Sequence, residues 1–240
     1  MAPQDYHYSG EELYLFSKAE NWKKYFSAAI KPFITGSVLE AGAGLGKTSP
    51  YLINEKVTRW TYLEPDPNLA KKINSGMEES NIGIPASIIN GTIANIPVLE
   101  LYDTILYIDV LEHIEKDQLE INLILQKLAP NGRLIILAPA YNSLMNNFDR
   151  AIGHYRRYDK KMLRNLIKNS LSEIKLFYLE STGIGLLWVN KILSRKKYPT
   201  QKEVLIWDRL FVPVSKFADK FFRYRFGKTI IGVWQKNSTA

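Results

Sequence analysis

The chain has 240 residues, 46% of them hydrophobic and 23% charged, which suits one globular α/β domain with room for an insertion. Cysteine is absent, which excludes disulfides, thiolate zinc sites and a cysteine nucleophile. The formal net charge of +8 favours an anionic partner such as nucleic acid, a lipid surface or a phosphorylated substrate, although a general bias toward lysine would produce the same excess.

Helix and strand patterns alternate from the N-terminus onward. Ser9 and Glu12 have the spacing of a capping box, and apolar residues then recur at helical intervals as far as Ile30, which predicts an amphipathic N-terminal helix. The elements predicted after it are strands at 38–40, 60–64, 86–89, 104–109 and 134–137, and helices near 69–77 and 119–128. This alternation predicts a mainly parallel, doubly wound sheet.

The last third of the chain is less regular. Asp159 is placed to cap a helix over 160–168, and an apolar run predicts a strand over 174–179. A helical, aromatic and basic segment follows, before a last strand over 229–234. We interpret residues 183–227 as a helical insertion before the last strand, at a sheet edge where insertions usually shape the ligand site.

The stretch VLEAGAGLGKTS, residues 38–49, is compatible with two kinds of nucleotide site. Residues 41–48 have the spacing of a phosphate loop, in which Lys47 and Thr48 would contact phosphates and magnesium, as in a kinase or NTPase. The same stretch has the alternating glycines of a Rossmann-type cofactor turn, namely Gly42, Gly44 and Gly46.

Two carboxylates favour the cofactor turn. Glu40 stands directly before the turn, where it disfavours a triphosphate but attracts a cationic group. Glu64 ends the next strand, where an acid accepts hydrogen bonds from both hydroxyls of a ribose. We therefore favour the Rossmann-type turn and keep the phosphate-loop kinase or NTPase as the alternative.

Four segments extend this pattern between about residues 37 and 140: VLEAGAGLG, YLEP, YDTILYIDVLEHI and LAPNGRLIILAPA. In this order and spacing they resemble the class I S-adenosylmethionine-dependent methyltransferases. The resemblance implies a doubly wound, mainly parallel, seven-stranded Rossmann-like sheet, with S-adenosylmethionine as the cofactor. It also implies methyl transfer by direct displacement to a small-molecule, glycan or lipid-linked acceptor.

On this interpretation the chain is a single methyltransferase domain without internal repeats. Its expected parts are an N-terminal helical lid (1–35), a cofactor-binding core (36–182), a helical insertion facing the substrate or a membrane (183–227), and the last strand and tail (228–240).

The resemblance places five residues around the methionine and ribose parts of the cofactor. Glu40, Gly42 and Gly44 would surround the methionine end, because a side chain at either glycine would block the close approach of the backbone. Glu64, followed by Pro65, would hold the ribose.

Four further residues are implied near the adenine and the sulfonium. Thr92 stands where the family often has an aspartate that binds the adenine amino group, so Thr92 or a backbone group would substitute for it. Ile93 would pack on the ring. Asp109, at the end of the fourth strand, would lie beside the sulfonium, and Val110 would form part of the wall.

Two histidines are candidates for a general base, which methyl transfer requires only if the acceptor must lose a proton. His113 follows the fourth strand, and His154 follows the loop after the fifth strand. For each the alternative is a packing or hydrogen-bonding role. No metal site is predicted.

The segment GHYRRYD, residues 153–159, is the most distinctive stretch outside the cofactor core, and a similar one occurs in bacterial methyltransferases that resemble surface-polysaccharide and lipid-linked glycan enzymes. Its aromatic and basic residues could form a clamp for a phosphate or carboxylate with a ring or sugar alongside: Tyr155, Arg156, Arg157 and Tyr158. The alternative is that the arginines pair with carboxylates and order the loop.

Residues 207–226 have the pattern of a basic amphipathic helix. One face would carry Leu210, Val214, Phe217, Phe221 and Tyr224, and another Lys216, Lys220 and Arg223. Such a helix either lies on an anionic membrane or packs on its own domain. Because no membrane-spanning run and no signal peptide is evident, we expect a cytoplasmic protein, with peripheral membrane association as the open alternative.

Two other functions are less well supported. A nucleic-acid methyltransferase that acts on base amino groups would need prolines and an aromatic after the fourth strand, where this chain has DVLE. A catalytically silent binding protein would not require the intact glycines or Glu64. The acceptor atom stays open among oxygen, nitrogen and carbon, since one fold serves all three.

Overall fold

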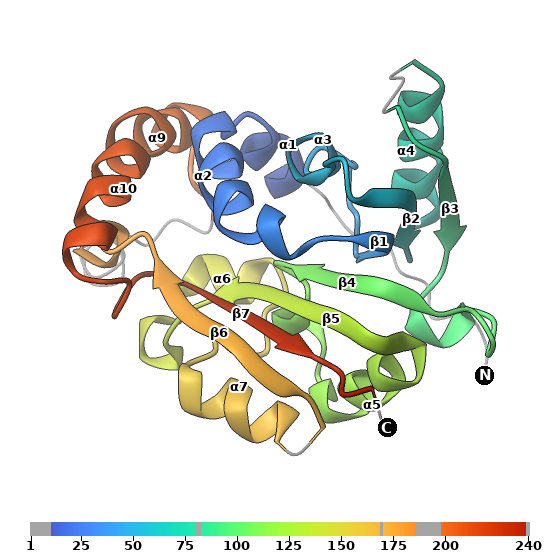
Figure 1. Ribbon diagram of the computed structural model, residues 1–240. Coiled ribbons are helices and arrows are strands. Elements are labelled where there is room, and N and C mark those ends of the chain that lie inside the picture. Colours follow the sequence, from blue (N-terminus) through green and yellow to red (C-terminus); the bar gives the residue numbers. More distant parts are fainter. Residues whose placement is uncertain (1–10, 80–82, 169, 186–197, 239–240) are drawn as a thin grey trace.

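The computed structural model describes residues 11–79, 83–168, 170–185 and 198–238 (Figure 1). Its centre is a seven-stranded sheet in the order β3-β2-β1-β4-β5-β7-β6. The strands are β1 (Gly36–Ala41), β2 (Val57–Glu64), β3 (Ala86–Asn90), β4 (Tyr102–Ile108), β5 (Leu128–Pro139), β6 (Ser172–Leu179) and β7 (Thr229–Gln235). The first five pair in parallel, and β7 runs antiparallel to both β5 and β6. This confirms the predicted fold class.

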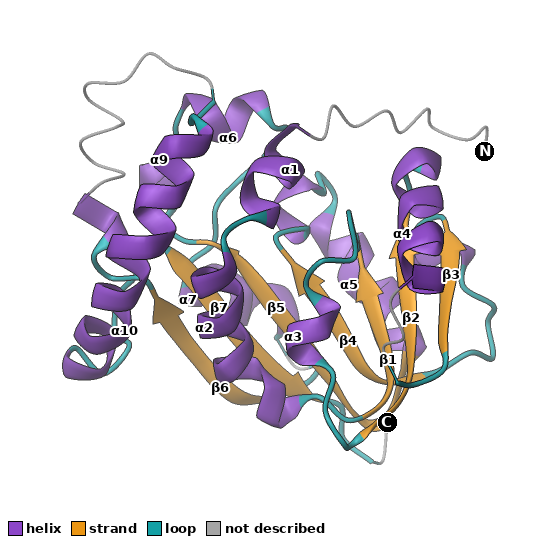
Figure 2. Ribbon diagram, turned by 90° about the horizontal axis from the view of Figure 1, so that it is seen from above, coloured by secondary structure: helices purple, strands orange, loops and turns teal. Residues whose placement is uncertain are grey.

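Helices cover both faces of the sheet (Figures 1 and 2). Ile121 and Ile124 of α5 (Asp117–Lys127) and Leu163 of α7 (Lys160–Ile167) belong to one buried cluster. The opposite cluster takes side chains from α2 (Glu20–Ile30), α3 (Ser49–Leu52), α4 (Pro67–Glu79), α9 (Gln201–Ile206) and α10 (Val212–Phe221). The smaller α1 (Glu11–Ser17) and α6 (Asn147–Ala151) lie near the edge where β1, β4 and β5 end.

The apolar runs of the central strands follow from this layering. In β5, Leu134 and Ile136 enter one cluster, whereas Ile135 and Leu137 enter the other. Successive side chains of a strand point to opposite faces, so a strand buried on both sides must be apolar at every position. These strands were therefore predictable from the sequence.

The N-terminal segment forms two helices instead of the single predicted one. The backbone leaves helical geometry at Ala19, between α1 and α2. Asp208 explains the new start: its carboxylate accepts hydrogen bonds from the backbone N–H groups of Trp22 (2.8 Å) and Asn21 (3.2 Å), the latter 187 residues away in sequence. The predicted cap, Ser9, lies outside the described residues.

The insertion before β7 is helical, as predicted, and consists in its described part of α9, a π-helical turn (Trp207–Phe211) and α10. α10 buries Val212, Ser215 and Asp219. The predicted apolar stripe instead points outward: Leu210, Val214, Phe217 and Phe221 are 61%, 56%, 75% and 82% exposed. Only Tyr224 of that stripe packs against the core.

Candidate functional site

A cleft of about 980 Å³ opens at the edge where the parallel strands end. Its walls come from the turn after β1, the segment after β4 and the loop after β5. Helices α1 and α2 and the insertion line the remaining sides. Ligands of doubly wound sheets bind at this edge because the loops that follow neighbouring strands converge there.

The N-terminal helices and the insertion form one wall, because two buried aspartates join them. Asp208 caps α2 as described above. Asp219 of α10 accepts hydrogen bonds from the Tyr25 hydroxyl (2.8 Å) and from the backbone N–H of Glu180 (2.5 Å). Burial, followed by the hydrogen bond to Asp219, raises the pKa of Tyr25. The predicted lid and insertion therefore lie on the same side of the cleft.

The turn after β1 presents bare backbone and one carboxylate to the cleft. Gly42 and Gly44 have left-handed φ angles of 61° and 60°, and a Cβ on Gly42 would lie 2.5 Å from a methyl carbon of Val110. Glu40 is buried, and its Oε2 accepts a hydrogen bond from the Trp60 indole at 3.0 Å. Burial raises the pKa of Glu40 to about 8, although the Trp60 hydrogen bond opposes the shift.

Glu64 binds the backbone of the same turn. Its Oε2 accepts the Gly44 N–H at 2.7 Å, and its Oε1 accepts the Asp66 N–H at 2.9 Å. Burial raises the pKa of Glu64 against the effect of these two hydrogen bonds. Neither Glu64 nor Pro65 lines the cleft.

Thr92 and Ile93 also lie away from the cleft lining. The Thr92 hydroxyl and backbone N–H both donate to Asn95 Oδ1, at 3.1 and 2.8 Å, and cap a short 3-10 helix. Ile93 is 1% exposed and packs in the core. A contact of either residue with an adenine ring stays a prediction.

Asp109 follows β4 in a left-handed conformation, with φ 53°, and its N–H donates to the Leu137 carbonyl at 2.9 Å. Its side chain lies on the cleft wall. Asp109 is exposed to the cleft, but the protein around its carboxyl group displaces part of the hydration. This desolvation raises the pKa of Asp109 to about 6, and the charges of His154, Lys228 and Arg157 oppose the shift.

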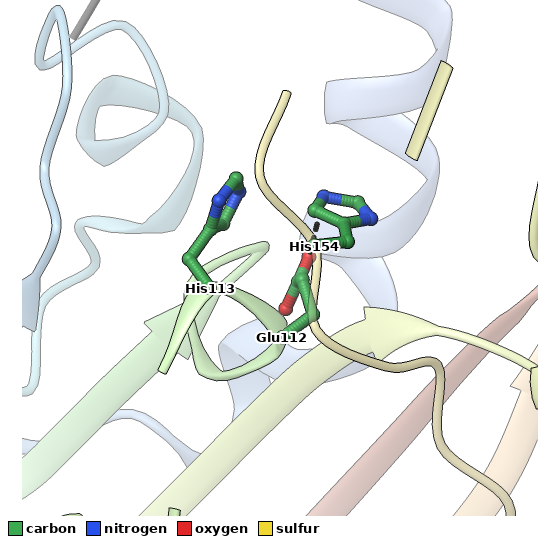
Figure 3. A group of neighbouring side chains, drawn as sticks. All are labelled: Glu112, His113 and His154. Carbon is green, nitrogen blue, oxygen red and sulfur yellow. Dashed lines mark ion pairs between the residues drawn. The ribbon is translucent and has the colours of Figure 1, made fainter. Parts of the chain in front are cut away.

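The two candidate histidines meet beside Asp109. Their rings lie edge to face with centroids 4.5 Å apart, and Glu112 lies beneath them (Figure 3). Glu112 Oε1 is 3.8 Å from His154 Nε2. Burial lowers the pKa of His113 to about 3, helped by the neighbouring His154, and burial raises the pKa of Glu112 well above its usual value.

Asp149 orients His154. Its Oδ1 lies 3.1 Å from His154 Nδ1, and both of its oxygens accept hydrogen bonds from the Arg157 guanidinium, at 2.9 and 2.8 Å. Burial opposes ionisation of Asp149, but the His154 hydrogen bond and the Arg157 charge lower its pKa overall. The structure thus holds Asp149 as a carboxylate in the cleft wall.

The rest of the 153–159 segment is tied to the loop after β4. Arg156 forms an ion pair with Asp117 and donates to the Glu115 carbonyl at 2.6 Å. Tyr158 is buried, and its hydroxyl donates to Asp117 at 2.9 Å. Tyr155 is 53% exposed and does not line the cleft. This geometry corresponds to the loop-ordering alternative for the arginines.

Asp159 caps α7 by accepting the Met162 N–H at 2.8 Å. The histidines, Asp109, Glu40 and the glycines come together at the cleft, whereas Glu64, Pro65, Thr92 and Ile93 do not line it.

The cleft carboxylates that the sequence did not indicate as site residues include Glu112, Asp149 and Glu180. Asp149 has one local signal, since it stands three residues after Asn146 and forms a capping box with it. Glu180 is fully buried and pairs with Lys228 Nζ at 3.0 Å. Nothing in the local sequence around Glu180 indicates this pairing, because the partner lies on the far side of the insertion.

Comparison with known proteins identifies a family that matches this chain. A family model described as a methyltransferase domain matches residues 13–170. The matched region contains the turn after β1, the segment after β4 and the histidine pair. No curated protein matches the chain significantly.

Solved structures share the fold at low sequence identity. The N-methyltransferase NodS from Bradyrhizobium japonicum WM9, in complex with S-adenosylhomocysteine, is 12% identical, with 91% of this chain and 88% of that chain covered and a TM-score of 0.57. Coclaurine N-methyltransferase, bound to N-methylheliamine and S-adenosylhomocysteine, is 13% identical, with 91% and 72% covered and a TM-score of 0.58. The [4+2]-cyclase SpnF is 12% identical, with 90% and 80% covered and a TM-score of 0.62.

Proposed function

The chain belongs to the methyltransferase domain family and uses S-adenosylmethionine to transfer a methyl group, and we propose that the acceptor is a small molecule, a glycan or a lipid-linked compound that enters the cleft. The observation that supports this most directly is the turn after β1, which offers the cleft a side-chain-free backbone next to the Glu40 carboxylate.

The residues of the turn fit the methionine end of the cofactor. A Cβ at Gly42 would collide with Val110, so the backbone here has no room for a side chain, and the turn lines the cleft. Burial raises the pKa of Glu40 in the cofactor-free protein, and the cofactor's ammonium group beside it would favour the ionised carboxylate. When bound, S-adenosylmethionine supplies a sulfonium whose methyl group is already activated for displacement.

Glu64 is proposed to accept the ribose hydroxyls. Each of its oxygens accepts one backbone hydrogen bond, and a carboxylate oxygen can accept a second. Because the Gly44 and Asp66 amides fix the carboxylate in place, its orientation requires no further ordering when the cofactor binds.

The protein's remaining task is to align the acceptor and exclude water. Asn142, Asn146 and Asn147, from the loop after β5 and the start of α6, line the cleft and offer amide N–H donors that suit a hydroxylated acceptor. We propose that the acceptor's reacting group lies beside His113 and His154. We assign Arg156 and Arg157 to loop order, since their guanidinium groups already bind Asp117 and Asp149.

Calorimetry and labelling test the function. S-adenosylhomocysteine should bind the purified protein with 1:1 stoichiometry, and magnesium-ATP should not bind, which separates methyl transfer from the phosphate-loop alternative. Glu64→Gln should weaken binding at least about tenfold, the loss of one hydrogen bond to a charged group, while the exposed control Glu55→Gln should leave it unchanged. Transfer of a tritiated methyl group into lipid or glycan extracts would identify the acceptor; label confined to nucleic acid would contradict the proposal.

We also propose that the insertion docks on an anionic membrane. Among the described residues no helix is long and apolar enough to cross a bilayer. The outward stripe of α10 includes the exposed Phe217 and Phe221, and Lys216 and Lys220 beside them are also exposed. An exposed aromatic stripe flanked by basic residues has the chemistry of an interfacial helix.

Co-sedimentation with vesicles containing phosphatidylglycerol tests this docking. The double variant Phe217→Ser/Phe221→Ser should lose vesicle binding. Leu99→Ser, which removes a 94% exposed apolar side chain outside the insertion, should retain it. Equal binding by both variants would contradict the proposal.

A further inference from the structure

Glu112, His113 and His154 converge on one point of the cleft (Figure 3). Each offers a ligand atom, and these atoms all lie within 4.8 Å of one another. Within residues 11–79, 83–168, 170–185 and 198–238 this is the one group of histidines and carboxylates with such spacing. Glu112 and His113 follow β4, whereas His154 comes from the segment after α6.

Hydrogen bonds from other described residues do not compensate the burial of the Glu112 carboxylate. It is fully buried, and neither oxygen has a hydrogen-bond partner on another described residue. His154 Nε2 lies 3.8 Å from Oε1, which is too far for a hydrogen bond. A buried carboxylate without hydrogen bonds is costly, so a cation or a proton must accompany it.

The orientation of His154 exposes a lone pair toward this carboxylate. Asp149, held ionised by two hydrogen bonds from Arg157, lies 3.1 Å from His154 Nδ1 and is placed to accept its proton. In the neutral ring with the Nδ1 proton, Nε2 is then an acceptor, and it faces an oxygen that is also an acceptor. A histidine fixed by a carboxylate in this way is the usual support of a metal-binding imidazole.

We propose that Glu112, His113 and His154 bind a divalent first-row transition-metal ion, such as Mn²⁺, Co²⁺ or Zn²⁺, at the wall of the cleft. Two imidazoles and one carboxylate favour these ions over Mg²⁺ or Ca²⁺, which prefer oxygen ligands throughout. Asp109, which lies on the same wall, adds negative potential.

Three protein ligands leave open positions on such an ion. These positions face the cleft, where they would hold oxygen atoms of the acceptor and orient them. The assignment of these positions to an acceptor rests on the proposed function, whereas the metal site itself does not. The competing arrangement without metal is a proton on Glu112 itself, whose pKa burial raises.

Titration of chelator-treated protein with Mn²⁺, Co²⁺, Zn²⁺ and Mg²⁺, by calorimetry and equilibrium dialysis, tests the site. We expect one transition-metal ion per chain and weaker binding of Mg²⁺. Glu112→Gln and His154→Gln should weaken binding by more than the roughly 10- to 100-fold that loss of an outer partner of a ligand costs. The control Glu115→Gln makes the same chemical change at an exposed position of the same loop and should bind as the unaltered chain does.

A measurement on the unaltered chain covers the case in which the variants fail to fold. The sequence has three histidines, so ¹⁵N ring signals can be followed individually during titration with Zn²⁺. The signals of His113 and His154 should shift together at one equivalent. A shift of His7 alone, or of none, would overturn the metal site.

Titration of the same samples with S-adenosylhomocysteine separates the two proposals. Cofactor binding without transition-metal binding would overturn the metal site and leave the proposed function intact, with a proton on Glu112 in place of the ion. Metal binding without cofactor binding would overturn the proposed function and leave the site. Equal metal affinity in the Glu112→Gln, His154→Gln and Glu115→Gln variants would place the ion elsewhere and overturn the inference.

Discussion

Burial should decide how much two ion pairs of the same geometry contribute to stability. Asp149 and Arg157 form a two-point hydrogen-bonded pair in the cleft wall with side chains 1% and 6% exposed. Glu173 and Arg164 form the same kind of pair, at 2.8 and 2.9 Å, with side chains 31% and 54% exposed. We compare Asp149→Asn with Glu173→Gln in metal-free protein.

The expected loss for Asp149→Asn has two parts. Breaking a buried pair leaves an uncompensated guanidinium, which costs about 3–5 kcal/mol. Asp149 Oδ2 also accepts the Asn146 N–H at 2.8 Å in the capping box of α6, and loss of a cap costs about 1 kcal/mol. The total of about 4–6 kcal/mol corresponds to a fall in Tm of roughly 10–20 °C for a chain of this size. Glu173→Gln should cost under about 1 kcal/mol, because solvent screens the exposed pair.

Thermal and urea denaturation measure both variants. The double variant Asp149→Asn/Arg157→Met should recover part of the loss, since no unpaired guanidinium remains in the cleft wall. If Asp149→Asn melted within a few degrees of Glu173→Gln, the claim that Asp149 neutralises a buried Arg157 would be refuted.

Three further predictions concern the turn, its carboxylate and the cleft wall. Gly42→Ala should lower stability by about 1–3 kcal/mol and should also lower cofactor affinity, because the new Cβ meets Val110 in a left-handed backbone. Adding Val110→Ala should restore only part of the stability and of the affinity. Full restoration, measured by denaturation and calorimetry, would exclude backbone strain. The pKa of Glu40 is raised from 4.5 to about 8, so the folded state binds this proton more tightly than the unfolded chain does. The stability of the cofactor-free protein should therefore fall as the pH rises from about 4.5 to 8. Glu40→Gln should flatten this pH dependence in urea denaturation, and an unchanged slope would count against the shift. Tyr25→Phe should cost about 1.5–3 kcal/mol by removing the hydroxyl that donates to Asp219, and a neutral effect in denaturation would mean that the two helical segments are not joined there.

Most of the sheet was predictable because its signals are local. Strands buried on both faces are apolar at successive positions, and the alternating glycines mark a left-handed turn whatever surrounds them. The end of α1 was not predictable, since the carboxylate that caps α2 belongs to Asp208, 187 residues beyond Asn21. Periodicity shows that a segment is amphipathic but not which distant group interrupts it.

The outward stripe of α10 has a similar cause. Hydrophobicity alone favours burial of Phe217 and Phe221, yet Asp219 occupies the inner face. Its carboxylate accepts hydrogen bonds from Tyr25 and from the backbone of Glu180 and Ser181. Those bonds fix the rotation of the helix and leave the aromatic side chains in solvent. A pattern confined to residues 207–226 contains no trace of this constraint.

The histidine cluster depends on contacts between segments far apart in sequence. The Tyr155 N–H donates to the Glu112 carbonyl at 2.8 Å and brings His154 over the segment after β4. Motif spacing showed that Glu112 and His113 follow a strand, but only the folded loop shows that His154 joins them. Glu112 therefore escaped notice, although it is the most deeply buried member of the cluster.

We propose that the arginines of the 153–159 segment act on the substrate through the side chains that they bind. Arg157 directs two nitrogens to Asp149 and keeps it ionised, and Asp149 fixes the ring of His154. The Nε2 of His154 then faces Glu112 in the cleft. Loss of Arg157 should therefore alter the tautomer and orientation of His154 before it alters any charge seen by the acceptor. The segment's effect on catalysis would run through the histidine cluster, which makes the ¹⁵N signal of His154 a direct measure of what Arg157 does.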